Sequence, residues 1–212
     1  MTTLSVSGGG HQYGYRKIFH EVELELTSGD VLAITGANGS GKSTLLKILA
    51  GVLQPSYGSV KLTISQKTIP RDQYPLYVGL VAPYVNLYED LTLTENLEFI
   101  AKVRSVKIDD DRIQSIVSRI GLESDMDSFV RTYSTGMHQR ARLVAALYHE
   151  PKVILMDEPT LGLDREGRDI VRGIVNQMQT SGHVTVIASN LEDDIDLAHQ
   201  SICIEDFGPN SI

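Results

Sequence analysis

The sequence has a single cysteine, Cys203, so no disulfide bond can form within its 212 residues, which favours a reducing compartment. Long apolar runs are also lacking. No stretch approaches the roughly 18 uninterrupted apolar residues typical of a membrane-spanning helix. Residues 1–10 contain neither the basic nor the apolar region of a secretory signal. We therefore expect a cytoplasmic protein, in which any membrane role comes through a partner.

Positive charge is scarce as well. Lysine and arginine total 19 against 27 aspartates and glutamates, and the formal net charge is −8. No cluster of basic residues stands out, so we expect no direct binding of nucleic acid or of an anionic membrane. The six histidines show no ligand spacing such as H-x-x-x-H, which argues against a histidine metal site. Cys203 falls in an apolar segment and is predicted to be a packed core thiol.

The composition is that of an ordinary globular chain, with 42% hydrophobic and 22% charged residues. Strand and helix patterns alternate at both ends, which predicts an α/β fold with a mostly parallel sheet covered by helices. Residues 91–149 predict helices alone, which indicates an inserted helical sub-domain. The expected strands are 22–26, 31–34, 59–64, 78–81, 153–156, 184–188 and 202–204. The expected helices are 42–51, 94–103, 109–120, 136–148, 166–180 and 191–198.

A glycine-rich loop between the strand 31–34 and the helix 42–51 fits the phosphate-binding pattern G-x-x-x-x-G-K-[ST]. Its glycines let successive N–H groups turn inward to hold an anion, and the following helix N-terminus faces the same phosphates. A chance match to a glycine-rich turn is the alternative, but the strand before and the helix after oppose it. We predict that the loop binds ATP through Gly36, Ala37, Asn38, Gly39, Ser40, Gly41, Lys42, Ser43 and Thr44.

Within this loop, Lys42 is expected to bridge the β- and γ-phosphates, and the Ser43 hydroxyl to ligate Mg²⁺. Two acids at the end of the strand 153–156 complete the predicted site. Asp157 is expected to orient Mg²⁺ through a bound water, and Glu158 to accept a proton from the attacking water as general base. The simpler alternative is that both acids are solvated residues at a strand end.

Three further segments follow the order of motifs of one family. Residues Tyr133 to Arg140, Y-S-T-G-M-H-Q-R, precede the acidic strand end, and residues 161–164, L-G-L-D, follow it. Tyr13 lies 29 residues before Lys42. Together with the phosphate loop, this order resembles the ATP-binding cassette (ABC) ATPases over nearly the whole chain. The segments would be the family's signature, its D-loop and the aromatic residue that stacks on adenine.

The resemblance implies a P-loop NTPase fold with a mostly parallel central sheet, an N-terminal antiparallel β portion and an inserted α-helical sub-domain. It implies one ABC ATPase domain over residues 1–212, with its core at about 1–90 and 150–212 and the helical sub-domain at about 91–149. The implied cofactors are ATP and Mg²⁺.

The resemblance also implies the partners and their contacts. Two cassettes would pair head to tail, as a homodimer or with a different cassette, so that Ser134 and the Gly136 N–H of one contact the γ-phosphate on the other. Asp164 of the D-loop-like segment would join the nucleotide site, and Tyr13 would stack on adenine. Transmembrane permease subunits would dock at Pro83 to Leu93, so that the chain lies peripherally on the inner face of the cell membrane.

Each of these implied roles has a simpler alternative. Ser134 or Thr135 can merely cap the helix that follows. Tyr13, or Tyr15 two residues on, can be a half-buried strand residue. The segment from Pro83 to Leu93 can pack inside the helical sub-domain.

Four positions depart from the family pattern. Thr135 and Met137 replace a glycine and the glutamine of the signature, Pro83 stands where the Q-loop glutamine is expected, and Ser189 replaces the switch histidine. A serine can still donate one hydrogen bond to a γ-phosphate, although it is shorter and never cationic. Asn190 is a second candidate for that contact. Because Glu158 is retained, the pattern predicts hydrolysis that is slow, with Ser189, Lys42 and Glu158 as the catalytic residues.

The leading hypothesis is therefore the ATPase subunit of an ABC transporter, which energises transport through separate membrane subunits by ATP-driven dimerisation. The alternative is a soluble ABC-type ATPase that acts as a switch on nucleic acid or a protein assembly. A small-molecule kinase with a P-loop fails to explain the signature-like and D-loop-like segments.

Overall fold

The computed structural model of the chain describes residues 1–208. Its strands are β1 (Thr2–Tyr13), β2 (Arg16–Thr27), β3 (Val31–Thr35), β4 (Tyr57–Ile64), β5 (Lys67–Ile69), β6 (Val78–Val81), β7 (Val153–Asp157), β8 (Val184–Ala188) and β9 (Gln200–Cys203). Its α-helices are α1 (Lys42–Leu49), α2 (Leu93–Arg104), α3 (Asp110–Ile120), α4 (Thr135–Leu147), α5 (Arg165–Thr180) and α6 (Glu192–Ile195). Short 3₁₀ helices occupy Arg71–Leu76, Glu123–Asp125, Val130–Thr132 and Ile204–Phe207.

The strands form two sheets. The central sheet has the order β6-β7-β8-β3-β9 and all of its pairings are parallel, whereas the second sheet has the order β2-β1-β4-β5 and is antiparallel. Every residue of β7 and β8 is buried, as continuous apolar runs predict for strands covered on both faces. The predicted fold class, a parallel central sheet with an N-terminal antiparallel portion, is confirmed.

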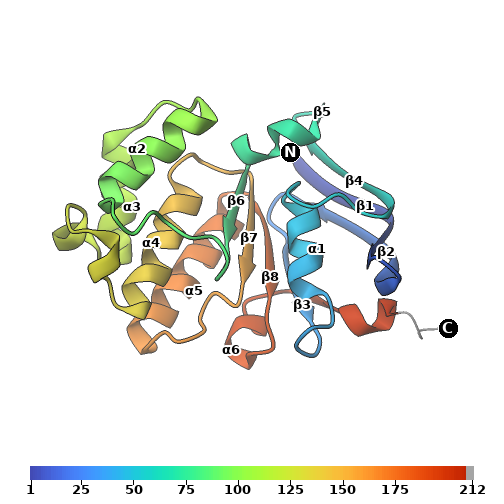
Figure 1. The fold of residues 1–212 in the computed structure, drawn as a ribbon. Helices are drawn as coiled ribbons and strands as arrows, with labels where there is room; N and C mark the ends of the chain where they lie inside the picture. The colour runs from blue at the N-terminus through green and yellow to red at the C-terminus, as the bar shows by residue number, and fades with distance from the viewer. Residues whose placement is uncertain (209–212) are drawn as a thin grey trace.

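The two faces of the central sheet carry different layers. Figure 1 shows α1 and the antiparallel sheet on one side, and α2 to α5 on the other. The side chains follow this division, since Leu155 packs with α1 and the antiparallel strands, whereas its neighbours Ile154 and Met156 pack with the helices. This alternation along β7 is the period of two expected of a strand.

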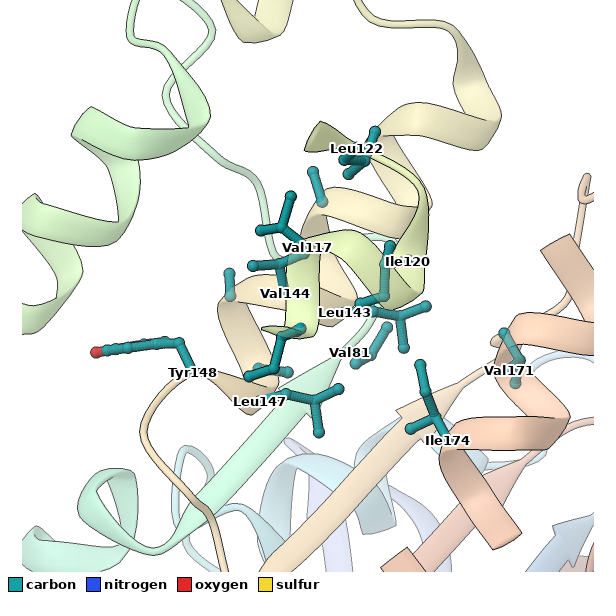
Figure 2. Packing of buried hydrophobic residues seen from close by; sticks show 14 of the residues in the cluster. Val81, Val117, Ile120, Leu122, Leu143, Val144, Leu147, Tyr148, Val171 and Ile174 are labelled. Carbon is teal, nitrogen blue, oxygen red and sulfur yellow. The ribbon is translucent and has the colours of Figure 1, made fainter. Parts of the chain in front are cut away.

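The helical layer packs tightly onto one edge of the parallel sheet. In Figure 2, side chains of α3 and α4 meet above the end of β6, with α5 beside them. The labelled residues include Val117 and Ile120 of α3, Leu143, Val144 and Leu147 of α4, Val171 and Ile174 of α5, and Val81 of β6. One buried cluster joins these helices to β6 and α5, so the packing does not mark where a sub-domain would begin or end. The proposed boundaries of the sub-domain stay a prediction.

The structure differs from the sequence prediction in several elements. Strands β1 and β5 were not predicted, because the Ser7–Gly10 run and the polar 67–69 segment lack a clear apolar alternation. The expected helix 191–198 is only one turn long, α6. The last strand lies at Gln200–Cys203, and a 3₁₀ helix begins at Ile204, so the predicted strand 202–204 is displaced. Cys203 is half-buried, and the prediction of a core thiol was wrong.

Candidate nucleotide-binding site

The glycine-rich loop joins the end of β3 to the start of α1. Gly36, Gly39 and Gly41 have φ angles of 133°, 81° and 118°, in a region that favours glycine. A Cβ on Gly41 would lie 2.6 Å from Cγ2 of Ile18, so the loop runs too close to β2 for any side chain there. No side chain caps α1, which leaves the N–H groups of its first turn available for an anion.

Lys42, the first residue of α1, folds back over this loop. Its side chain is 6% exposed, and Nζ donates to the carbonyl oxygens of Gly36 (2.5 Å) and Ala37 (3.2 Å). These bonds fix the ammonium group of Lys42 at the mouth of the loop. A fixed positive charge beside free N–H groups is suited to holding a polyphosphate.

A groove of about 430 Å³ opens beside the loop. Its lining residues come from three segments that are far apart in the sequence: Tyr13, Arg16, Ile18, Asn38, Gly39, Gly41, Lys42, Ser43, Thr44 and Glu158. The loop residues Gly36, Ala37 and Ser40 are not among them. Tyr13 lines the groove and is 50% exposed, while Tyr15 is fully exposed and does not line it. The structure therefore places Tyr13, and not Tyr15, where an adenine ring could stack.

Asp157 ends β7 and is 4% exposed. The Ser43 and Tyr84 hydroxyls and the positive charges of Lys42 and Lys47 all stabilise its ionised form. Burial raises the pKa of the Asp157 carboxyl, and these neighbours oppose that rise. Burial, followed by the Asp157 charge, raises the pKa of Tyr84 well above its usual range, so the phenol keeps its proton.

The oxygen groups of Asp157 and Ser43 fit a hard cation such as Mg²⁺. Among the residues described, no three histidine, cysteine, aspartate or glutamate side chains gather into a metal-binding group. Mg²⁺ commonly binds through one or two protein ligands together with substrate phosphates. Asp157 and Ser43 match that case, since they lie beside a groove suited to phosphate.

Glu158 follows Asp157 with a backbone φ of 49°, the left-handed region that residues with a Cβ avoid. Such a conformation costs about 1–2 kcal/mol and persists where the surroundings hold it. Here the Glu158 N–H donates to the carbonyl oxygen of Ala188 at the end of β8 (2.8 Å). This turn directs the Glu158 side chain into the groove, where a water next to the phosphates could be deprotonated.

Ser189 does not line the groove. Its side chain is 1% exposed, its hydroxyl donates to Oδ2 of the buried Asp194 (2.6 Å), and its oxygen accepts from the Leu191 N–H (3.1 Å). Asn190, the next residue, reaches the phosphate loop instead, since its Oδ1 accepts from the Gly36 N–H (3.2 Å). Burial raises the pKa of Asp194, and the bond from Ser189 opposes that rise.

We expect Ser189→Ala to affect stability more than catalysis. The change leaves Oδ2 of Asp194 without its donor in a buried site, which costs about 1–3 kcal/mol of unfolding free energy. The rate of ATP hydrolysis should change by less than about threefold, because the hydroxyl does not face the groove. Urea unfolding and steady-state ATPase assays measure the two effects.

Ser201→Ala is the matched control, since Ser201 lies on the exposed part of β9 and should leave both quantities unchanged. A loss of rate above about tenfold at unchanged stability would instead support a direct catalytic role for Ser189.

Two of the residues assigned to nucleotide contacts cap helices in this chain. The Ser134 hydroxyl accepts from the Met137 N–H (3.2 Å) at the start of α4, and Asp164 accepts from the Gly167 N–H (2.8 Å) at the start of α5. The capping alternative is confirmed for Ser134. Neither residue lines the groove of its own chain. The contact of Ser134 with a partner's nucleotide and the place of Asp164 in the nucleotide site stay predictions.

Some residues of the segment from Pro83 to Leu93 pack inside the protein, and others are exposed where a partner could dock. Leu87 and Leu93 are buried in the helical layer, which supports internal packing. Tyr88 is 56% exposed, and its ring lies 5.0 Å from that of Phe99, which is itself exposed. The exposed aromatic pair leaves the docking prediction open. Within residues 1–208, none of the helices is both long and apolar enough to cross a membrane.

Several groups near the site were not predicted from the sequence. Arg16 lines the groove three residues after Tyr13, and only its place next to that tyrosine could have indicated it. Gln139 donates to the carbonyl oxygen of Pro159 (3.0 Å), and the Arg142 guanidinium donates to that of Val85 (3.0 Å). Both side chains come from α4, so this helix is bonded to the segments after β6 and β7.

Comparison with known proteins agrees with this geometry. The family model described as "ABC transporter" matches residues 19–161. An uncharacterised ABC transporter ATP-binding protein of Bacillus subtilis, YdbJ, is 32% identical over 95% of this chain and 66% of its own length. The daunorubicin resistance ATP-binding protein DrrA3 of Streptomyces coeruleorubidus is 30% identical over 98% of this chain. The chain spans 66% of the length of each of these two relatives.

A solved structure of a dimeric ATP-binding cassette in a post-hydrolysis state, bound to ADP and Pi, superposes with a TM-score of 0.81. It is 22% identical, and the match covers 94% of this chain and 93% of that one, so it supports the fold. Together with the family match over residues 19–161, these similarities show that the chain belongs to the ABC transporter family, as an ATP-binding cassette.

Proposed function

We propose that this chain binds and hydrolyses ATP, and that it energises an ABC transporter through separate transmembrane permease subunits. The observation that carries the proposal is the groove, in which Lys42, Ser43 and Glu158 meet next to the buried Asp157. A cation, a hydroxyl and two carboxylates around one phosphate-sized groove supply the parts that phosphoryl transfer to water requires.

Each group has one task in this proposal. The loop N–H groups and Lys42 hold the β- and γ-phosphates, and Tyr13 stacks on the adenine. Glu158 accepts a proton from water as the water oxygen bonds to the γ-phosphorus. The bond from that phosphorus to the bridging oxygen breaks, and ADP and phosphate are left. Ser43 and Asp157 would hold Mg²⁺, which neutralises charge on the phosphate oxygens.

Hydrolysis is proposed to be slow, because a buried serine stands in place of the switch histidine. Asn190, which already contacts the phosphate loop, is the better placed of the two neighbours to reach a γ-phosphate. A second cassette, either identical or different, would complete the site. In a homodimer it would supply Ser134 and Gly136, and Asp164 would join the nucleotide site.

The transport part of the proposal predicts where the chain is found. It should fractionate with the inner face of the cell membrane, co-purify with a polytopic membrane protein, and hydrolyse ATP faster in that complex than alone. The curated relatives named as drug-resistance and export ATP-binding proteins support this expectation. The exposed Tyr88 and Phe99 on the helical layer offer a surface for such a partner.

Detergent extraction of membranes, followed by affinity purification of the tagged chain and mass spectrometry, tests the prediction. Recovery of an active ATPase only from the cytosol, or only with nucleic acid, would overturn the transport assignment and favour the soluble switch.

A further inference from the structure

The 3₁₀ helix at Ile204–Phe207 lies against the start of the phosphate loop. The strand before it, β9, ends at Cys203, which pairs with Thr35 at the end of β3. Glu205 and Ala37 each follow these strand ends by two residues, so the parallel register continues past the sheet and sets them side by side. The Ala37 N–H accordingly donates to Oε2 of Glu205 (3.1 Å). An acid far along the chain is thus bonded to the backbone of the loop.

The same arrangement is found on the other side of β3. There Ile34 pairs with Ala188 of β8, and two residues further on the Gly36 N–H donates to Oδ1 of Asn190 (3.2 Å). The first two N–H groups of the loop are therefore held from both neighbouring strands. Ile204, the first residue of the 3₁₀ helix, is fully buried, and its Cγ2 would lie 2.9 Å from a Cβ on Gly36. The core thus anchors this helix where it touches the loop.

Lys42 holds the other side of the same two residues. Its ammonium group has three N–H donors, and two of the bonds it makes go to the carbonyl oxygens of Gly36 and Ala37. Bridging the β- and γ-phosphates takes two donors, so Lys42 must release at least one carbonyl oxygen when the nucleotide binds. The start of the loop then depends more on the bonds at its N–H groups, which Asn190 and Glu205 accept.

We propose that Glu205 is a positioning residue for the phosphate loop, whose carboxylate holds the Ala37 N–H while Lys42 turns to the phosphates. The inference rests on the proposed function and extends it to a residue outside the motifs identified in the sequence. A loop that is already held in its bound shape loses less conformational freedom on binding, which raises affinity. Because Glu205 is exposed and water competes for its oxygens, the expected effect is moderate and binding is not abolished.

The competing explanation is electrostatic, since a carboxylate beside a phosphate site repels the nucleotide. Two substitutions separate the bond from the charge. Glu205→Gln removes the charge but keeps a side-chain oxygen that can accept from the Ala37 N–H, whereas Glu205→Ala removes both. If repulsion dominates, both variants bind nucleotide more tightly than the wild type. If the bond dominates, only Glu205→Ala binds more weakly.

The test is an equilibrium titration of the chain with a fluorescent ATP analogue and Mg²⁺. For Glu205→Ala we expect the dissociation constant to rise about three- to tenfold, the usual contribution of one hydrogen bond. Glu205→Gln should bind at least as tightly as the wild type. The thermal midpoint without nucleotide should stay unchanged, because Lys42 still holds the loop in that state. With the analogue bound, hydrogen exchange at the Ala37 amide should be faster in Glu205→Ala alone.

Asp206→Ala is the matched control. It removes a negative charge from the same 3₁₀ helix but keeps the acceptor of the Ala37 N–H, and should leave the dissociation constant unchanged. Three results overturn the inference while the proposed function stands: unchanged or tighter binding in Glu205→Ala, a loss that Glu205→Gln does not restore, or a loss that comes with a lower thermal midpoint. A wild-type chain that binds no nucleotide with Mg²⁺ would overturn the proposed function itself.

Discussion

Replacing Glu158 with glutamine should lower the rate of ATP hydrolysis by about 10²–10⁴-fold, the usual contribution of a positioned general base. Glutamine keeps the size of the side chain and its place in the groove, but it cannot accept the proton of the attacking water. Binding of ATP should remain, because Lys42 and the loop are unaltered. A steady-state phosphate-release assay and an equilibrium nucleotide titration measure the two quantities.

The structure sharpens this prediction, because the left-handed backbone at Glu158 is held by a bond to Ala188 and not by its side chain. The substitution should therefore leave the thermal midpoint unchanged. Glu166→Gln is the matched control, since Glu166 is an exposed glutamate in the first turn of α5 and lies outside the groove. Wild-type turnover in Glu158→Gln would show that another group takes the proton.

The phosphate loop and the acidic strand end could be predicted because their chemistry is local. The residues from Gly36 to Ser43 are contiguous, and a glycine-rich turn between a strand and a helix admits few backbone paths. Asp157 and Glu158 end a buried strand of a parallel sheet, and such sheets hold ligands at the carboxyl ends of their strands. The groove accordingly brings Lys42, Ser43 and Glu158 together.

The direction of a side chain was harder to predict than its position. The family's motif order places Ser189 where a phosphate contact is expected. In the structure its hydroxyl instead donates to Asp194, a buried acid five residues later. Asp194 lies in the single turn of α6, which places it next to Ser189. The sequence predicted a longer helix there, so this contact was not expected. A buried carboxylate needs a donor, and this requirement decided the orientation of Ser189.

Contacts between distant segments were missed for a related reason. Arg142 meets Val85, and Gln139 meets Pro159, only because β6 and β7 are neighbours and α4 packs beside them. No spacing along the chain encodes these pairs. Strand β1 was missed because Gly8, Gly9 and Gly10 interrupt its apolar alternation, with irregular pairing at that point.

Replacing Gly41 with alanine should have a large effect on both stability and binding. The residue has a φ of 118°, and the new Cβ would lie 2.6 Å from Cγ2 of Ile18 and 3.0 Å from Cδ1 of the buried Phe19. Backbone strain and overpacking together should lower the unfolding free energy by about 2–4 kcal/mol. Because the loop must shift, affinity for ATP should fall at least about tenfold.

Gly173→Ala separates this local effect from the general effect of adding a methyl group. Gly173 lies within α5, has no atom within 4 Å of its ideal Cβ, and has no positive φ. Alanine there should raise stability by about 0.5–1 kcal/mol and leave nucleotide binding unchanged. Urea unfolding of both variants, with and without nucleotide, measures the contrast. Equal stability and equal affinity in Gly41→Ala and Gly173→Ala would contradict the close approach of the loop to β2, on which the shape of the groove depends.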